Sequence, residues 1–191
     1  MELAEEACRR LGYAPEFRRI AWEQKDALLQ SGEIDCLWGC FTMTGREDDY
    51  TWVGPYVNNS IMFVVTADSG ITGKADLEGK KVSVQTGTTA EEYCMGNGYE
   101  VLAFTANNDA AAALTSGKVD AWVVDNEVAL AMAPELGLTV LDEAMTSEPY
   151  AFAFQKGSEL VTPFNEALDA LLSDGAVEQI FQQYGVTYIA P

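Results

Sequence analysis

The stretch from Leu29 to Arg46 reads LQSGEIDCLWGCFTMTGR, and its pattern decides the fold class. It predicts the end of a helix, a tight turn at Gly32, a nearly continuous apolar strand over Ile34 to Cys40, and a polar loop with one arginine, Arg46. A strand that is apolar on both faces is typical of a parallel sheet covered by helices. The stretch therefore predicts an α/β fold.

A shorter copy of the pattern, LTSGKVDAWVVDNE, follows 85 residues later, from Leu114 to Glu127. Both copies have a leucine, a serine–glycine pair and an aspartate at the same spacing. The polar residue at the end of the second strand is Asp125. Such a repeat predicts two similar βα lobes. Because ligands bind at the carboxyl ends of strands in open α/β sheets, Arg46 and Asp125 are predicted to be two halves of one binding site.

The rest of the chain also alternates between helical and extended patterns. Thr88, with Glu91 three residues later, predicts a capping box, and Asn107 and Asp125 are predicted N-caps. Helices are predicted at 1–11, 24–30, 87–95, 107–116, 163–172 and 176–184. Strands are predicted at 16–21, 62–66, 81–85, 100–104, 119–124 and 138–141, and a return crossing at 149–155.

Composition excludes several classes of protein. The chain has 191 residues, of which 48% are hydrophobic, and this indicates a folded chain that can bury a core. Its longest apolar runs are far shorter than the roughly 20 residues that span a bilayer. The net charge of −19 argues against nucleic acid and anionic lipid as partners.

The sequence predicts no metal site and no cofactor. It contains no histidine and no CxxC pair among its four cysteines. Cys36 and Cys40, if both lie on one extended strand, are roughly 13 Å apart and too distant for a disulfide. Four buried thiols, or a bridge between Cys8 and Cys36, both remain open.

The residues at the predicted strand ends suit a zwitterionic ligand. Arg46 can bind a carboxylate with two parallel hydrogen bonds, and Thr42 adds a hydroxyl nearby. Asp125 can accept from an ammonium group. The turn at 87–89 offers main-chain N–H groups at a helix N-terminus, and Trp22 offers an aromatic wall. The alternatives are a surface arginine, a plain helix cap, an ordinary helix start and a core tryptophan.

Five motifs together resemble the extracellular solute-binding proteins of family 3, of the polar amino acid binding type. They are LAEEACRRLGYAPEF, SGEIDCLWGCFTMTGREDDYTWVGPY, DLEGKKVSVQTGTTAEEY, SGKVDAWVVDNEVA and LLSDGAVEQIFQQYG, and they run through almost the whole chain. The second resembles the family's strand, T-x-T, arginine and later Pro-Tyr, and the fourth resembles its aspartate strand.

The resemblance implies a two-lobe Venus-flytrap fold, like the type II periplasmic binding proteins. Lobe 1 would comprise residues 1–64 and 153–191, lobe 2 residues 65–152, and the hinge strands would lie near 62–66 and 149–154. The resemblance also implies a ligand site. In it, Arg46 would bind the α-carboxylate with Thr42, the Cys40 main chain and Thr89; Asp125 would bind the α-ammonium; Trp22 would pack on the ligand; and Gln85 would set side-chain preference.

Two features depart from the family pattern. Only Gly45 separates Thr44 from Arg46, where the family usually has two residues. The chain also starts after the family's first strand, so lobe 1 is expected to be truncated at its N-terminus. Residues Val186 to Ile189, or a second copy of the chain in a dimer, are the candidates to fill the gap.

The resemblance implies a binding protein rather than an enzyme: a solute receptor that delivers an amino acid to the permease of an ABC importer. One alternative is the extracellular sensor domain of a membrane-bound histidine kinase or diguanylate cyclase. A less favoured one is a dehydratase on the same fold, with Glu92 or Glu127 as its acid or base. The expected location is periplasmic or cell-surface and membrane-tethered, with the signal or anchor outside this chain.

Overall fold

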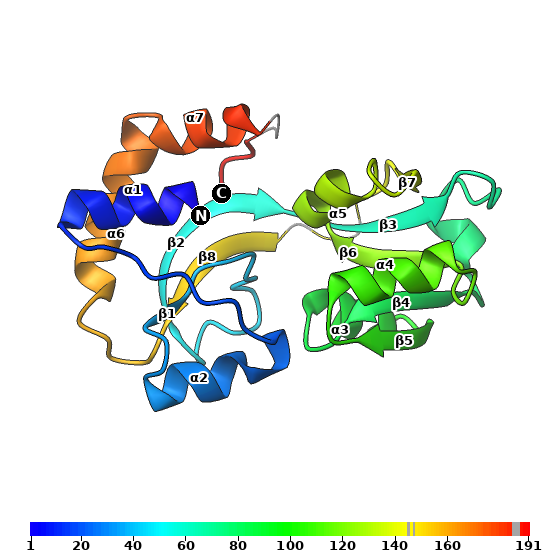
Figure 1. Cartoon of the computed structure of the whole chain (residues 1–191), viewed down its shortest axis with the longest axis horizontal. Coiled ribbons are helices and arrows are strands. Elements are labelled where there is room, and N and C mark those ends of the chain that lie inside the picture. The colour runs from blue at the N-terminus through cyan, green and yellow to red at the C-terminus, as the bar shows by residue number, and fades with distance from the viewer. Residues whose placement is uncertain (145, 147, 185–187) are drawn as a thin grey trace. The chain divides into compact units, whose positions relative to one another are not determined.

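The structure is a computed structural model, and it describes residues 1–144, 146, 148–184 and 188–191 of the chain. The chain forms two compact units, whose elements are labelled in Figure 1. Unit 1 contains Met1–Ile20, Gln24–Asn58 and Glu148–Pro191, and unit 2 contains Ala21–Glu23 and Asn59–Ser147.

The unit boundaries differ from the predicted lobe boundaries near residues 64 and 153. Residues 62–66, near which a hinge strand was predicted, lie in β3 (Ile61–Thr66), which pairs with two other strands of unit 2 and therefore belongs to that unit. Residues 148–154, predicted to lie mostly in lobe 2, pair within unit 1. Apart from the short stretch Ala21–Glu23, which groups with unit 2, the chain changes units at 58/59 and at 147/148.

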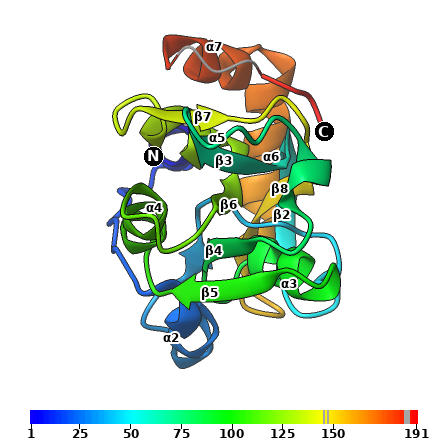
Figure 2. The same ribbon diagram turned by 90° about the vertical axis from the view of Figure 1, so that its right-hand side faces the viewer.

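Unit 2 contains a five-stranded sheet in the order β5-β4-β6-β3-β7, which Figure 2 shows. Strand β4 runs parallel to β5 and β6, whereas β3 runs antiparallel to β6 and β7. The strand bounds are β3 Ile61–Thr66, β4 Lys81–Gln85, β5 Glu100–Phe104, β6 Ala121–Asp125 and β7 Leu138–Val140.

Both faces of this sheet are buried, because successive side chains of β3 and β6 enter different cores. Phe63 and Val123 belong to a core with Ala90 and Cys94 of α3 (Thr89–Gly96). Trp122 belongs to the core on the other face, with side chains of α4 (Asn107–Thr115) and α5 (Asn126–Met132). Each buried apolar side chain of this kind contributes about 1.5–3 kcal/mol to stability. The short helix η2 (Lys74–Leu77) precedes β4.

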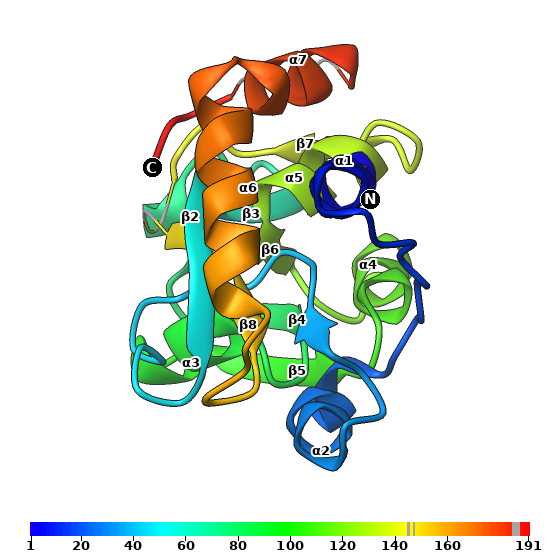
Figure 3. The same ribbon diagram turned by 90° about the vertical axis from the view of Figure 1, so that its left-hand side faces the viewer.

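Unit 1 contains a three-stranded sheet in the order β1-β8-β2, with helices packed on it (Figure 3). The strands are β1 (Cys36–Leu37), β2 (Thr51–Asn59) and β8 (Glu148–Phe154). The helices are α1 (Glu2–Leu11), α2 (Lys25–Ser31), α6 (Val161–Ser173) and α7 (Ala176–Gln183), and η1 (Trp22–Gln24) precedes α2. Phe152 of β8 is central to the core, since its ring stacks on Trp38 and Tyr56 with centroids 3.7 and 4.3 Å away.

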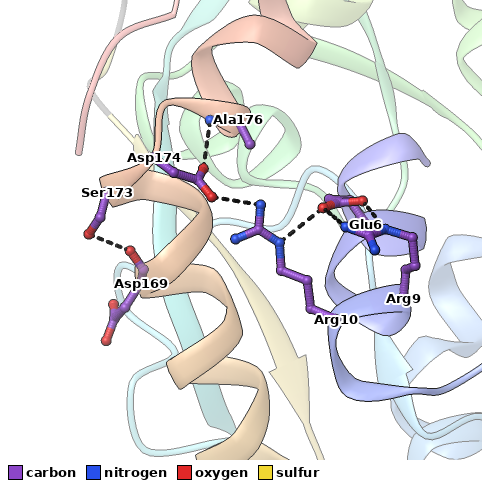
Figure 4. A network of polar contacts seen from close by, with 7 residues as sticks. All are labelled: Glu6, Arg9, Arg10, Asp169, Ser173, Asp174 and Ala176. Atoms are coloured by element: carbon purple, nitrogen blue, oxygen red, sulfur yellow. Dashed lines mark hydrogen bonds and ion pairs between the residues drawn. The ribbon is translucent and has the colours of Figure 1, made fainter.

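An ion-pair network joins α1 to the turn between α6 and α7 (Figure 4). The Arg10 guanidinium lies 2.9 Å from the Glu6 carboxylate and 2.7 Å from that of Asp174. The predicted break at 174–175 is confirmed, because Asp174 is the C-cap of α6 and Gly175 adopts a left-handed conformation with φ of 77°. The network fixes one end of α1 against the helix break.

Three local predictions were wrong. The strand predicted over Ile34 to Cys40 is reduced to two residues, and it pairs antiparallel with β8 rather than in a parallel sheet. Residues 16–21 form no strand and are almost all exposed. Asn107 is the first residue inside α4, and Ala106 occupies the cap position.

The internal repeat is confirmed locally. Gly32 and Gly117 both end a helix in the left-handed conformation, with φ of 73° and 71°. Each N–H donates back to a leucine carbonyl of the preceding helix, Leu29 at 3.2 Å and Leu114 at 2.9 Å. The following strands differ, because β1 lies at a sheet edge and β6 at a sheet centre.

The end of the chain lies against β2. The Asn58 main-chain N–H donates to the Ile189 carbonyl at 2.9 Å, and its side-chain amide donates to the Ala190 carbonyl at 2.8 Å. Of the predicted filler segment Val186 to Ile189, the first two residues lie outside the described residues.

The cysteines are free thiols, so no bridge joins Cys8 to Cys36 in this structure. Within the described part of the chain, no helix is both long and apolar enough to cross a membrane. Nor do three His, Cys, Asp or Glu side chains gather there as a metal site would require.

Candidate functional site

The segment after β1 continues the sheet of unit 1 rather than forming an open loop. The Phe41 carbonyl accepts from the Ala151 N–H, and the Met43 N–H donates to the Pro149 carbonyl, both at 3.1 Å. Phe41 and Thr42 are each only 3% exposed. This pairing fixes the main chain just before Arg46.

Arg46 lies in a tight turn at the end of this paired segment. Its N–H donates to the Met43 carbonyl at 3.0 Å, and its carbonyl accepts from the Trp52 indole at 3.2 Å. The guanidinium lies 5.9 Å from the centre of the Phe41 ring, which is within the range of a cation–π contact. The side chain is half-buried, so the guanidinium extends from a main chain held by hydrogen bonds and is still accessible to solvent.

Thr42 is predicted to offer its hydroxyl to a ligand, but in the structure this hydroxyl already has a partner within the protein. Its hydroxyl donates a short hydrogen bond to the carboxylate of Glu148, which is itself 3% exposed. Glu148 begins β8, and Thr42 pairs with Tyr150 of the same strand. Cys40, by contrast, is exposed.

Sequence reasoning missed a second cation at the Phe41 ring. Lys25 of α2 is only 8% exposed, and its ammonium lies 6.0 Å from the centre of the same Phe41 ring. It also pairs with Asp26 at 3.8 Å, and Asp26 accepts a short hydrogen bond from Tyr50. A sequence signal existed: Lys25 lies four residues before the buried Leu29, and therefore on the same face of α2.

Burial and the hydrogen bond to Asp26 both raise the pKa of Tyr50. The Tyr50 ring also contacts the rings of Phe41 and Trp52, each with centroids 5.2 Å apart. Phe41 and Trp52 are themselves 5.2 Å apart. Two rings of this triad contact Arg46, Trp52 through its indole N–H and Phe41 through its face.

In unit 2 the predicted capping box at the start of α3 is present in a shifted form. The Thr88 hydroxyl accepts from the Glu91 N–H at 3.3 Å, and the Glu91 carboxylate accepts from the Gly87 N–H at 2.7 Å. The Glu91 carboxylate therefore already accepts from the Gly87 N–H, one of the main-chain groups that were predicted to bind an anionic group of the ligand. Thr89, the first residue of α3, is half-buried.

Gln85 ends β4, and its side chain is held on both sides. Its oxygen accepts from the Asn107 amide at 3.0 Å, and its nitrogen donates to the Thr105 carbonyl at 3.1 Å. Trp22 is half-buried and groups with unit 2. Its indole N–H donates to the Gly87 carbonyl at 3.2 Å, so the tryptophan stands beside the same turn.

Asp125 occupies the N-cap position of α5, as predicted, but its side chain makes no capping hydrogen bond to that helix. Its carboxylate accepts instead from the Asn59 side-chain amide at 3.3 Å. Sequence reasoning also missed Asn59, because its link to Asp125 depends on the pairing of β3 with β6, which aligns Ile61 with Asp125.

Glu127, two residues after Asp125, is half-buried. Burial raises the pKa of its carboxyl group, and the residue's own N–H partly offsets this effect. One of its carboxylate oxygens is buried with no hydrogen-bond partner among the described residues. The charged form of Glu127, which lies two residues from the candidate site residue Asp125, is therefore disfavoured by desolvation.

The seven predicted site residues divide between the units. Unit 1 contains Cys40, Thr42 and Arg46, whereas unit 2 contains Trp22, Gln85, Thr89 and Asp125. Unit 1 thus carries the cation and unit 2 the carboxylate. Within unit 2, Trp22 and the turn before Thr89 are in direct contact through Gly87.

Sequence comparison gives independent information on this pair of units. The profile described as "Bacterial extracellular solute-binding proteins, family 3" matches residues 1–187. The L-cystine-binding protein TcyJ of Escherichia coli K12 is 28% identical over 192 residues, which cover 96% of this chain and 72% of that protein. The L-arginine-binding protein of Pseudomonas aeruginosa is 30% identical over 172 residues, covering 82% and 66%.

Solved structures agree with the fold. An ancestral arginine-binding protein bound to glutamine superposes with a TM-score of 0.87 at 34% identity, covering 95% of this chain and 84% of that one. The ancestral amino acid-binding protein AncCDT-1, a precursor of cyclohexadienyl dehydratase, gives a TM-score of 0.87 at 29% identity, covering 95% and 82%. The predicted two-lobe α/β fold is thereby confirmed.

Proposed function

Because the chain belongs to the bacterial extracellular solute-binding proteins of family 3, we propose that it binds a free amino acid as a zwitterion. The observation that carries the proposal is the pair of opposite charges, one on each unit, Arg46 in unit 1 and Asp125 in unit 2. Arg46 follows β1 in unit 1, and Asp125 ends β6 in unit 2. A ligand with one carboxylate and one ammonium can satisfy both side chains.

In the proposed complex, Arg46 binds the α-carboxylate with its planar fork, with help from the Cys40 main chain and from Thr89. Thr42 belongs to the same group, although its hydroxyl proton is already donated to Glu148. Asp125 accepts from the α-ammonium.

Trp22 packs on the aliphatic part of the ligand. Gln85 contacts the end of the side chain and sets the preference between amino acids.

The proposed function follows from placing the main anchor of the carboxylate, Arg46, in unit 1 and that of the ammonium group, Asp125, in unit 2. Neither unit alone carries both Arg46 and Asp125. A ligand that contacts both side chains would bind more tightly when the two units are closed around it, and binding would therefore shift the protein toward that closed arrangement. A closed, loaded receptor is what a permease would recognise. We therefore propose that the chain delivers its amino acid to an ABC importer.

A thermal-shift screen over the proteinogenic L-amino acids and L-cystine tests this function, because a ligand that binds only the folded state raises its stability. We expect a shift of several degrees for one chemical group of amino acids. The absence of any shift, repeated by calorimetry with L-arginine, L-glutamine and L-cystine, would refute amino acid binding.

The complete gene distinguishes import from sensing. A lipobox and an adjacent permease gene support the importer role. A downstream transmembrane helix with a kinase or cyclase domain supports the sensor role.

Glu127 supports a second candidate, a dehydratase. A carboxyl group whose pKa is raised by burial suits general acid catalysis, and AncCDT-1 shares this fold. The direct test is incubation with a cyclohexadienyl amino acid, followed by ultraviolet detection of an aromatic product. Activity that Glu127→Gln abolishes would replace the binding function with catalysis; binding of the compound without turnover would eliminate the dehydratase.

A further inference from the structure

Asn59 is the residue at which the chain enters unit 2, and it is only 3% exposed. It ends β2, and the next strand, β3, pairs with β6 so that Ile61 stands opposite Asp125. The N–H of Asn126 also donates to the Ser60 carbonyl at 2.8 Å. This register brings the Asn59 side chain to the Asp125 carboxylate, where its amide nitrogen donates at 3.3 Å.

The carboxylate fixes the orientation of the amide. If the amide were reversed, its oxygen would face a carboxylate oxygen, and two acceptors would repel each other. The observed orientation leaves the Asn59 side-chain oxygen buried, with no hydrogen-bond partner among the described residues. A buried, unsatisfied acceptor destabilises the folded state. Asn59 is therefore a poor choice for stability alone.

Asp125 carries the second part of the argument. An aspartate at an N-cap position normally turns back to accept from an N–H in the first helical turn, and Asp125 does not do so. The Glu127 carboxylate interacts with its own main-chain N–H. An N-cap side chain accepts from the second or third N–H of its helix, here that of Glu127 or Val128. Because the Glu127 N–H already has this partner, a capping Asp125 would accept from the Val128 N–H.

We propose that Asn59 is a positioning residue, which holds the Asp125 carboxylate away from the helix cap and ready for the ammonium group of a ligand. The inference rests on the proposed function of Asp125 and adds the residue that prepares it. It explains why a destabilising amide is found at a buried position: the unsatisfied oxygen is the consequence of orienting the amide nitrogen toward the carboxylate.

The first test needs no ligand. Asn59→Leu has a similar volume and removes both the donor and the unsatisfied acceptor. We expect Asp125 in this variant to rotate and cap α5, which a crystal structure will show directly and slower exchange of the Val128 amide hydrogen will report in solution. Urea unfolding is expected to give unchanged or higher stability. An unmoved Asp125, or a large loss of stability, would overturn the proposal.

The second test measures binding to purified protein by calorimetry with L-arginine, L-glutamine and L-cystine. Asn59→Leu is expected to weaken binding about tenfold, the effect of one lost hydrogen bond to a charged group. In an Asp125→Asn background the same substitution should have little further effect, because Asn59 acts through Asp125. Equal losses in both backgrounds would overturn the positioning role.

Asn58→Leu is the matched control, since the neighbouring amide bonds the Ala190 carbonyl instead, and it should leave affinity and Val128 exchange unchanged. Asn59→Ala repeats each measurement with a smaller side chain. If the wild-type protein binds none of the three amino acids, the proposed function fails, whereas the rotation of Asp125 still decides the role of Asn59.

Discussion

Replacement of Arg46 by alanine tests the carboxylate site, and the structure indicates what should survive the change. The Arg46 turn is held by its main chain. The Arg46 N–H donates to Met43 at 3.0 Å, and the Arg46 carbonyl accepts from the Asp49 N–H at 3.0 Å and from the Trp52 indole at 3.2 Å. None of these bonds involves the guanidinium, so the fold is expected to persist in Arg46→Ala.

The expected loss of binding is much larger than the loss of stability. Removal of the guanidinium from the Phe41 ring, 5.9 Å away, costs about 0.5–1 kcal/mol of unfolding free energy. A fork on a carboxylate makes two charge-assisted hydrogen bonds of about 1.5–3 kcal/mol each. Their combined loss of about 3–6 kcal/mol raises Kd by about 10²- to 10⁴-fold.

Titration calorimetry with the amino acid that gives the largest thermal shift measures this Kd. Arg18→Ala is the control, since it removes the same charge from the same unit, at an exposed arginine that pairs with Glu33 at 3.1 Å. Its Kd should stay within about twofold of wild type. A folded Arg46→Ala protein that binds as tightly as the wild type would show that this arginine does not hold the carboxylate.

Three further predictions follow from the structure. Hydrogen bonds from Arg9 and Arg10 lower the pKa of Glu6 from 4.5 to about 2. The Glu6 charge therefore stabilises the fold above pH 4.5, and this contribution is lost as pH falls toward 2. Between these pH values, the unfolding free energy of Glu6→Gln, measured by urea titration, should vary less than that of the wild type. Cys40 is exposed, whereas burial raises the pKa of Cys94 to about 12, so iodoacetamide at pH 8 should alkylate Cys40 first and Cys94 only after unfolding, as mass spectrometry will show. Thr88→Ala removes the cap of α3 and should lower stability by about 1 kcal/mol in urea titrations, and an unchanged midpoint would contradict the role of this hydroxyl.

The central strands of unit 2, β3, β4 and β6, could be predicted because they are largely buried on both faces. Residues 81–85, which form β4, appear in the structure with the predicted bounds, and so do residues 100–104, although they form the mostly exposed edge strand β5. Continuous apolar runs between turn residues leave few alternatives when a strand has neighbours on both sides and helices on both faces. The Thr88 cap was predictable because it is local: the partners of the Thr88 hydroxyl, the Gln85 carbonyl and the Glu91 N–H, both lie three residues away in the sequence.

Unit 1 was harder to predict because its strands depend on distant partners. The segment 34–40 is apolar enough for a central strand, yet only Cys36–Leu37 pairs, at the sheet edge beside β8. Strand β2 was not predicted at all, because Gly54 and Pro55 interrupt its pattern. It lies at the other edge of the sheet, where a proline that lacks an N–H is tolerated.

The candidate site shows the same division between local and distant information. The charges of Arg46 and Asp125, and their positions after strands, are local properties that a sequence displays. Their immediate partners are not local: Lys25 reaches the Phe41 ring from α2, and Asn59 reaches Asp125 only because β3 and β6 are in register. Sequence reasoning therefore identifies which residues could hold a ligand, whereas the residues that orient them emerge only from the pairing of strands. For this reason the Asn59→Leu variant is the more demanding test of the structure, since its predicted effect on Asp125 has no counterpart in the sequence pattern.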